Sequence, residues 1–251
     1  NLNYTIDLYN FSTLEKEKTL FDTKKFPQIK RINSYTFNKQ EDKILIATNK
    51  EPIFRRSFSA DFYVFDLKKQ ELAKLTDKKI QEPLFSPQGD KVAYVYKNNI
   101  YIYDTQSKKE QQVTFDGEKN KIINGTSDWV YEEEFAIVRT FDWNADGTQL
   151  AYIRFDEHEV PEFSMDIYGT TLYPTKDTFK YPKAGEKNSV VSLYLYDVKA
   201  GKATQIPLDA YYIPRLQWTK EANILSVQTL NRHQNDFNII FVDASTKKFK
   251  S

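Results

Sequence analysis

The residues best able to do chemistry form an acidic run near the middle of the chain. The run reads Asp128-Trp129-Val130-Tyr131-Glu132-Glu133-Glu134. Three consecutive glutamates most often form a solvated face, but aromatic residues precede these and an apolar stretch, 135–138, follows them. Apolar flanks would hold the carboxylates rigidly against the protein, and concentrated negative charge on a rigid support suits a cation. We therefore interpret the run as a candidate cation-binding segment.

Two other polar groups are weaker candidates. Arg55 and Arg56 are adjacent and, taken alone, indicate surface charge. His158 lies among acids in the segment 156–159, which could suggest a metal site, but no other histidine is near it in the sequence. A hydrated loop is the preferred interpretation there, and no role is predicted for His233. We predict neither a metal nor a cofactor.

The chain lacks the familiar catalytic motifs. Its seven glycines are never closer than eight residues apart, at 117 and 125. A dinucleotide fingerprint, a nucleophile elbow and a P-loop need glycines two, four and five apart, so all three are excluded. The absence of cysteine excludes thiolate catalysis and disulfides. A formal charge of +1 argues against nucleic-acid binding, and no run of 18 apolar residues would span a membrane.

A strand–turn–strand pattern recurs four times and must position these residues. An aromatic residue closes one strand, a polar turn follows, and an apolar-rich strand comes next. The four copies lie at 37–47, 85–95, 143–153 and 218–227. A second marker, an aspartate that ends a strand, recurs at Asp66, Asp104, Asp197 and Asp243. Such an aspartate can accept hydrogen bonds from its own backbone and start a turn.

Each repeat holds about four short strands, as a propeller blade does. A composition of 15% aromatic residues also favours strands. We predict an all-β fold of β-propeller blades, each with four antiparallel strands. The pattern itself fits either a small closed ring of four blades or about half of a larger one. Wide marker spacing predicts insertions at about 118–140 and 156–190, and insertions of this length are usually functional.

The acidic run resembles the signature of the dipeptidyl peptidase IV family of serine peptidases. Matching blocks follow in order at 143–152, 159–161 and 181–185, so the resemblance covers most of the chain. It implies an N-terminal eight-bladed propeller followed by an α/β-hydrolase domain. Residues 1–251 would then form about four blades of that propeller, without the catalytic domain.

The resemblance also assigns site residues. It implies that Glu133 and Glu134 bind the free α-amino group of a peptide substrate, and that Arg55 holds a substrate carbonyl oxygen. An α-ammonium offers three donors, and two carboxylates can accept two of them. We expect a helical turn, from which two adjacent glutamates can converge on one cation. Glu132 would be structural or a solvated neighbour, and Asp128, Trp129 and Tyr131 would support the pair.

The predicted function is N-terminal anchoring, so that a dipeptide, Xaa-Pro or Xaa-Ala, is released by a domain outside this chain. Remote anchoring favours reaction by fixing orientation. This chain alone, without a Ser-Asp-His triad, should be inactive. The alternatives are a non-enzymatic propeller that serves as a protein or peptide binding scaffold, and a related tripeptidyl-releasing peptidase.

The predicted partners are peptides with a free N-terminus and the α/β-hydrolase domain of the same protein. The resemblance adds a homodimer formed through the arm at 160–190, although a hairpin folded onto its own blade is an alternative. Neither nucleic acid nor a membrane span is predicted. Because the first residue is Asn1 rather than Met and cysteine is absent, we expect a processed or truncated chain of bacterial origin, located in the periplasm or cell envelope.

Overall fold

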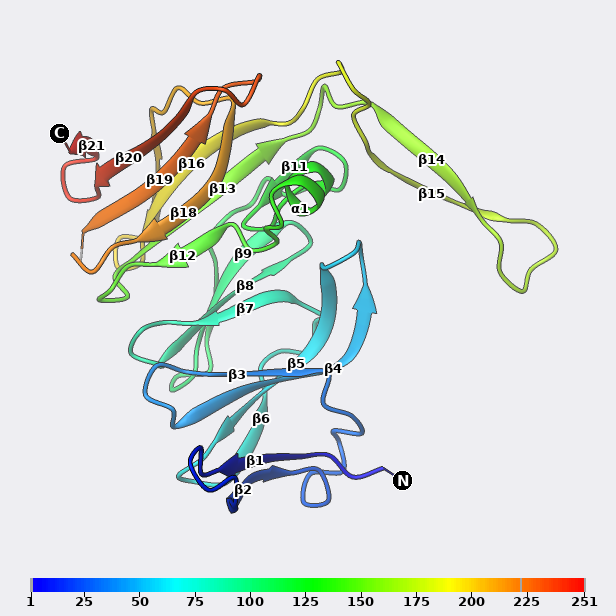
Figure 1. Cartoon of the computed structure of the whole chain (residues 1–251), viewed down its shortest axis with the longest axis vertical. Helices are drawn as coiled ribbons and strands as arrows, with labels where there is room; N and C mark the ends of the chain where they lie inside the picture. Colours follow the sequence, from blue (N-terminus) through cyan, green and yellow to red (C-terminus); the bar gives the residue numbers. More distant parts are fainter. Residues whose placement is uncertain (1, 222, 251) are drawn as a thin grey trace.

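Short antiparallel strands joined by polar turns make up nearly all of the regular structure. The computed structural model describes residues 2–221 and 223–250, and in that part of the chain α1 (Trp129–Glu134) is the only helix. Most strands pair with their neighbours in the sequence. Figure 1 shows the sheets arranged in chain order, from the N-terminal hairpin to the last sheet. The all-β prediction is confirmed.

Four sheets correspond to the four repeats. The first sheet comprises β3 (Ser34–Phe37), β4 (Lys43–Pro52), β5 (Phe58–Asp66) and β6 (Glu71–Lys74). The second comprises β7 (Gln81–Phe85), β8 (Lys91–Tyr96), β9 (Asn99–Asp104) and β10 (Glu110–Gln112). The third comprises β11 (Ile122–Asn124), β12 (Phe141–Trp143), β13 (Gln149–Asp156), β16 (Val190–Asp197) and β17 (Lys202–Ile206). The fourth comprises β18 (Tyr212–Trp218), β19 (Ile224–Leu230), β20 (Phe237–Asp243) and β21 (Lys248–Lys250).

A two-stranded hairpin precedes the first sheet, and the repeat pattern did not predict it. It consists of β1 (Thr5–Tyr9) and β2 (Lys16–Asp22), paired antiparallel. Ile6 and Phe21 from its two strands are buried with Ile44 and Phe65 of the first sheet. The hairpin therefore packs against the first sheet in the same way that the sheets pack on one another.

Apolar side chains fill the spaces between consecutive sheets. Each cluster joins buried residues of two neighbouring sheets: Phe62 with Tyr94, Val95 with Leu150, and Leu195 with Val227. The central strands are buried on both faces, as β4 and β8 illustrate. Sheets that pack face to face in this way are typical of propeller blades.

The strand-ending aspartates act as predicted. Asp66 Oδ1 accepts hydrogen bonds from the amides of Lys68 and Lys69, both at 2.9 Å. Asp104 does the same for the amides two and three residues ahead of it. Asp197 and Asp243 also accept from amides that follow them. Each carboxylate thus starts the turn between the third and fourth strands of its sheet.

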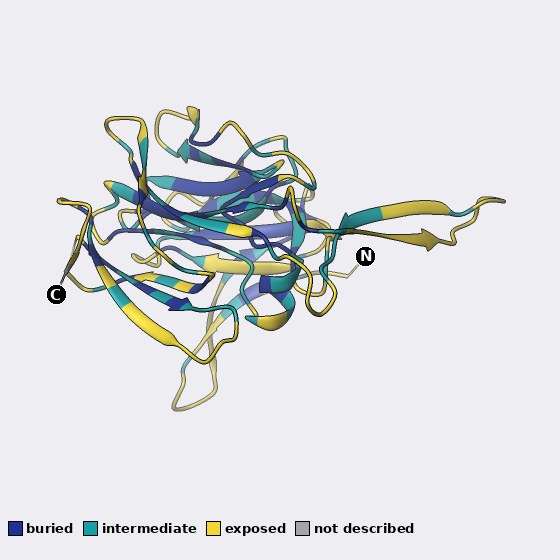
Figure 2. Cartoon of the chain, turned by 90° about the horizontal axis from the view of Figure 1, so that it is seen from above, coloured by how far each residue is buried: buried dark blue, intermediate teal, exposed yellow. Residues whose placement is uncertain are grey.

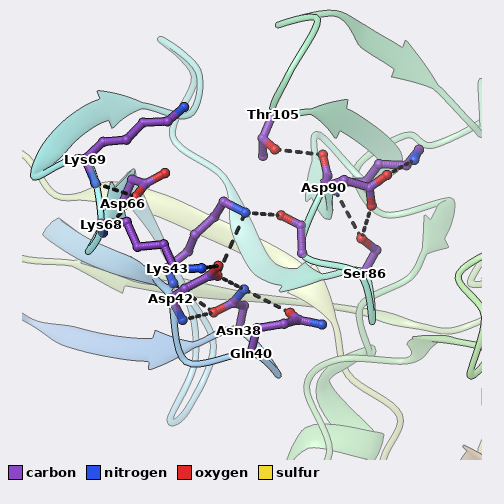
Figure 3. A network of polar contacts seen from close by, with 12 residues as sticks. Asn38, Gln40, Asp42, Lys43, Asp66, Lys68, Lys69, Ser86, Asp90 and Thr105 are labelled. Carbon is purple, nitrogen blue, oxygen red and sulfur yellow. Dashed lines mark hydrogen bonds and ion pairs between the residues drawn. The ribbon is translucent and has the colours of Figure 1, made fainter.

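The turns of neighbouring sheets are joined by side chains at equivalent repeat positions (Figure 3). Gln40 donates to the carbonyl oxygen of Pro87 at 2.6 Å. Lys43 Nζ donates to the carbonyl oxygen of Gly89 at 3.0 Å. One repeat later, Gln88 donates to the carbonyl oxygen of Asp146 at 2.8 Å. The glutamine that recurs in the first two turns therefore links each of them to the turn of the next sheet.

The third sheet departs from the simple pattern, and this departure creates the site. Both β11 and β12 pair with β13, so the first strand of the sheet is divided in two, and α1 lies between the halves. The predicted insertion 118–140 thus includes β11, a strand of the sheet itself. Gly125 begins the segment that leads from β11 through α1 to β12. Its φ is +81°, and a Cβ added there would lie 2.7 Å from Ile100 Cγ1. A side chain would be strained there.

The second insertion forms a projecting arm between β13 and β16. Its strands, β14 (Glu162–Ile167) and β15 (Thr175–Lys180), pair with each other. In Figure 2 the arm extends away from the sheets, and its outer part is exposed. The structure therefore places a solvent-facing hairpin within the segment predicted as an insertion at 156–190.

Candidate functional site

The helix α1 begins at a buried cap. Asp128 is extended, with φ −75° and ψ 178°, and its side chain accepts a hydrogen bond from the amide of Tyr131 at 2.9 Å. Ser189 Oγ donates to its second carboxylate oxygen at 2.5 Å. Burial raises the pKa of the Asp128 carboxyl, and the two hydrogen bonds oppose that rise. The predicted helical turn is confirmed, and Asp128 caps it.

Two aromatic residues fasten the helix to its surroundings. Tyr131 is buried, and its hydroxyl accepts a hydrogen bond from the amide of Ile213 in the fourth sheet at 2.9 Å. Its ring lies 4.8 Å from that of Phe155 in an edge-on contact. Trp129 contacts Tyr181, at the base of the arm, with ring centroids 4.3 Å apart. The helix is therefore held by both the arm and the fourth sheet.

The three glutamates have three different environments. Glu132 is 1% exposed, and its Oε1 accepts hydrogen bonds from the amides of Arg56 and Ser57 at 2.5 and 2.9 Å. Glu133 is half-buried and pairs with Arg55. The Glu134 side chain is exposed and has no ionic or hydrogen-bond partner among residues 2–221 and 223–250. Of the two roles predicted for Glu132, its burial selects the structural one.

The arginines come from the turn between β4 and β5. The turn closes with a hydrogen bond from the Ile53 amide to the Ser57 carbonyl oxygen at 2.9 Å. Arg55 Nε lies 3.1 and 3.0 Å from the two carboxylate oxygens of Glu133, although the residues are 78 positions apart in sequence. Arg56 Nη1 donates to the backbone carbonyl of Glu132 at 2.7 Å. The fold thus brings the predicted arginine to one of the two predicted glutamates, Glu133.

A cavity of about 580 Å³ lies beside this turn and the start of α1. Phe54, Trp129 and Phe179 contribute to its wall, and Glu157 lines it. Glu157 is 5% exposed, and its carboxylate has no hydrogen-bond partner in the described part of the chain. Burial, reinforced by the charge of Asp128 and opposed by Lys180, raises the pKa of Glu157 to about 8.

Sequence reasoning missed Glu157, although a signal was present. Ile153 and Phe155 are buried on β13, and strand alternation places Glu157 on the same face. The neighbouring His158 instead faces solvent, with Nδ1 2.7 Å from Asp156 Oδ1. Within residues 2–221 and 223–250, no group of three or more acidic, histidine or cysteine side chains is arranged to hold a metal.

The stacked sheets and the helix that interrupts the third of them define this chain as part of a β-propeller that carries a short acidic helix. The family model for the dipeptidyl peptidase IV N-terminal region matches residues 38–251. The chain therefore belongs to the dipeptidyl peptidase IV family and represents its N-terminal region.

Individual relatives agree with this assignment. The human prolyl endopeptidase FAP is 32% identical over 244 residues, which cover 92% of this chain and 31% of the human protein. The cat dipeptidyl peptidase 4 is 32% identical over 246 residues, which cover 90% of this chain and 31% of the relative. The crystal structure of the Porphyromonas gingivalis dipeptidyl peptidase 4, a bacterial protein, superposes with a TM-score of 0.94 at 41% identity, over 98% of this chain and 36% of that one. The chain thus spans about a third of the length of these relatives.

The helix α1 has six residues, which is too short to cross a bilayer. No helix among the described residues is long and apolar enough to span a membrane.

Proposed function

We propose that this chain is the substrate-anchoring propeller portion of a dipeptidyl peptidase IV-like serine peptidase. Glu133 and Glu134 bind the free α-ammonium of a peptide, and Arg55 binds a carbonyl oxygen in its first residues. The contact between Arg55 and Glu133, two residues 78 positions apart, carries this proposal. An α/β-hydrolase domain outside the chain then releases a dipeptide, Xaa-Pro or Xaa-Ala, and the four sheets belong to an eight-bladed propeller.

Charge and hydrogen-bonding capacity both support this assignment. Glu133, Glu134 and Arg55 together carry one net negative charge, which an incoming ammonium would neutralise. Glu134 follows Glu133 in the chain and is exposed, so it can form a charge-assisted hydrogen bond to the ammonium. Arg55 contacts Glu133 through Nε alone, and its terminal nitrogens have no partner among the residues that the structure describes. These nitrogens are therefore available to a carbonyl oxygen.

Anchoring the amino end would select substrates by length. A peptide held at its first ammonium presents a bond at a fixed distance to a nucleophile elsewhere in the protein. Fixed orientation of this kind can supply several kcal/mol towards the barrier. A substrate without an α-ammonium would lose its attraction to the glutamates. It would also lose the fixed distance between its amino end and the bond that is cleaved.

The test compares Glu134→Gln with Glu159→Gln, an exposed control, in the full-length protein. The substrate is a Gly-Pro chromogenic amide, and the products are identified by mass. A hydrogen bond to a charged group contributes about 1.5–3 kcal/mol, so we expect Glu134→Gln to lower kcat/KM by about 10- to 100-fold. N-acetylation of the substrate should abolish hydrolysis by the wild type. Unchanged kinetics in Glu134→Gln would refute the assignment.

The same experiment separates the alternatives. Release of tripeptides would indicate a tripeptidyl peptidase. Peptide binding without hydrolysis by the full-length protein would indicate a binding scaffold.

We further propose that the arm forms a homodimer interface. Apolar side chains are exposed along β14 and its tip, including Ile167, Tyr168 and Leu172 at 44, 81 and 91%. Aromatic residues are enriched at protein interfaces. Removal of residues 163–178 should convert a dimer into a monomer in light scattering, whereas an unchanged mass would refute the interface. From the family assignment we also propose an extracytoplasmic, bacterial envelope location, which cell fractionation would test.

A further inference from the structure

Glu132 makes the closest connection between α1 and the turn at 53–57. Two consecutive amides, those of Arg56 and Ser57, converge on its Oε1 atom at 2.5 and 2.9 Å. The Arg56 guanidinium also donates a third hydrogen bond, to the Glu132 backbone carbonyl, at 2.7 Å. The side chain of Glu132 is buried, so these are charge-assisted bonds in a medium of low dielectric. They join residues that lie 75 and 76 positions apart.

The other contacts of the turn cannot replace this connection. The Phe54 amide bonds to Ser57 Oγ at 3.1 Å, which shapes the turn internally. Phe54 also contacts Phe179, which belongs to the arm rather than to α1. Two other polar links reach the helix in the described part of the chain. One is the Arg56 bond to the Glu132 backbone carbonyl, which comes from a long side chain rather than from the backbone of the turn. The other is the ion pair between Arg55 and Glu133, in which the arginine side chain is 71% exposed. Exposed ion pairs contribute little to holding two segments together.

We infer that Glu132 is a positioning residue that sets the place of Arg55 relative to Glu133 and Glu134. This inference rests on the proposed function, in which those three side chains bind the substrate. Because the Glu132 side chain is buried against the turn, it does not bind the substrate itself. Its two acceptor bonds hold the backbone that carries Arg55, and its own backbone is continuous with Glu133. The first glutamate therefore determines the spacing at which the second and third meet the arginine.

The atoms of Glu132 suggest a discriminating pair of variants. Oε1 holds both amides, whereas Oε2 is buried and has no hydrogen-bond partner among the described residues. Burial raises the pKa of the nearby Glu82 carboxyl, and the Arg139 guanidinium opposes this rise. The charge of Glu132 raises that pKa further. Glutamine keeps a carbonyl oxygen for the two amides and removes the charge that acts on Glu82. Alanine removes the acceptor altogether.

The experiment uses the full-length protein with Glu132→Ala, Glu132→Gln, Arg55→Ala and the double variant Arg55→Ala/Glu132→Ala. Two readouts are combined: kcat/KM for Gly-Pro-p-nitroanilide, and hydrogen exchange of the amides at 56 and 57. Hydrolysis of p-nitrophenyl acetate, which has no amino terminus to anchor, controls for damage to the catalytic domain.

We expect Glu132→Ala to lower kcat/KM by about 10- to 100-fold and to speed exchange at both amides, with ester hydrolysis unchanged. Glu132→Gln should stay within about threefold of the wild type and retain slow exchange, because it keeps the acceptor. In the Arg55→Ala background, Glu132→Ala should have little further effect, since interacting positions are not additive.

Three outcomes would overturn the inference: wild-type kinetics in Glu132→Ala, unchanged exchange at residues 56 and 57 in that variant, or fully additive losses in the double variant. Failure of the proposed function looks different. In that case Arg55→Ala and Glu134→Gln would themselves leave kcat/KM unchanged, while the exchange rates would still report whether Glu132 holds the turn.

Discussion

Replacing Glu157 by glutamine should stabilise the protein by an amount that grows as the pH rises. Glu157 is 5% exposed in the cavity beside α1, and burial raises its pKa from 4.5 to about 8. A carboxyl whose pKa is higher in the folded state binds its proton more tightly there than in the unfolded state. Its ionisation therefore lowers the free energy of unfolding as the pH rises from about 4.5 to 8, and it has no such effect at lower pH.

The size of this effect follows from the shift in pKa. Each unit of pKa difference corresponds to about 1.4 kcal/mol, so the contribution lost between pH 5 and pH 8 is at most about 3–4 kcal/mol. Glutamine cannot ionise, so it removes this dependence. Any fixed effect of burying an amide adds the same amount at every pH. The slope of the difference between the two proteins, rather than its absolute value, therefore measures the Glu157 titration.

The assay is urea unfolding of the wild type and Glu157→Gln at pH 5, 6.5 and 8. Glu159→Gln is the matched control, because Glu159 lies two residues further on with its side chain 67% exposed, paired with Lys187. The difference between the control and the wild type should change by no more than about 0.5 kcal/mol across this range. Parallel pH profiles for the wild type and Glu157→Gln would refute the conclusion that this carboxyl is buried and predominantly protonated at neutral pH.

Two further substitutions test the support of the helix. Asp128→Ala removes the acceptor for the Tyr131 amide and for Ser189 Oγ, so it should lower the free energy of urea unfolding by about 1–3 kcal/mol, and Asp128→Asn by less. Equal losses for both variants would contradict a capping role. Gly125→Ala places a Cβ 2.7 Å from Ile100 Cγ1 at φ +81° and should cost about 2–4 kcal/mol in the same assay. A change below 0.5 kcal/mol would show that this backbone tolerates a side chain.

Much of the fold could be predicted because its determinants are local. The turn at 85–95 combines an aromatic strand end, Pro87 and Gly89, and Gly89 takes φ +70° as such a turn requires. Asp66 and Asp104 hydrogen-bond the amides just ahead of them. The helical turn at 129–134 was predicted because two adjacent glutamates can converge on one cation from a helix, and the structure adds a local cause, Asp128 in the cap position. The hairpin β1–β2 was not predicted. Its second strand ends at an aspartate, Asp22, as the repeats do, but the hairpin lacks the aromatic–turn–apolar strand marker and is stabilised by packing on the first sheet.

The repeating strands, the interrupting acidic segment and the residue types available for binding an amine can all be deduced from the order of the amino acids. How those residues are used depends on contacts between distant parts of the chain. Glu132, Glu133 and Glu134 are chemically identical neighbours, yet one is buried against two amides, one pairs with Arg55, and one faces solvent. Their differences arise because the helix points successive side chains about 100° apart, towards a turn that lies more than 70 residues away in the chain. No local pattern contains that neighbour, so only the tertiary contact between the turn at 53–57 and α1 assigns Glu132 and Glu133 their environments.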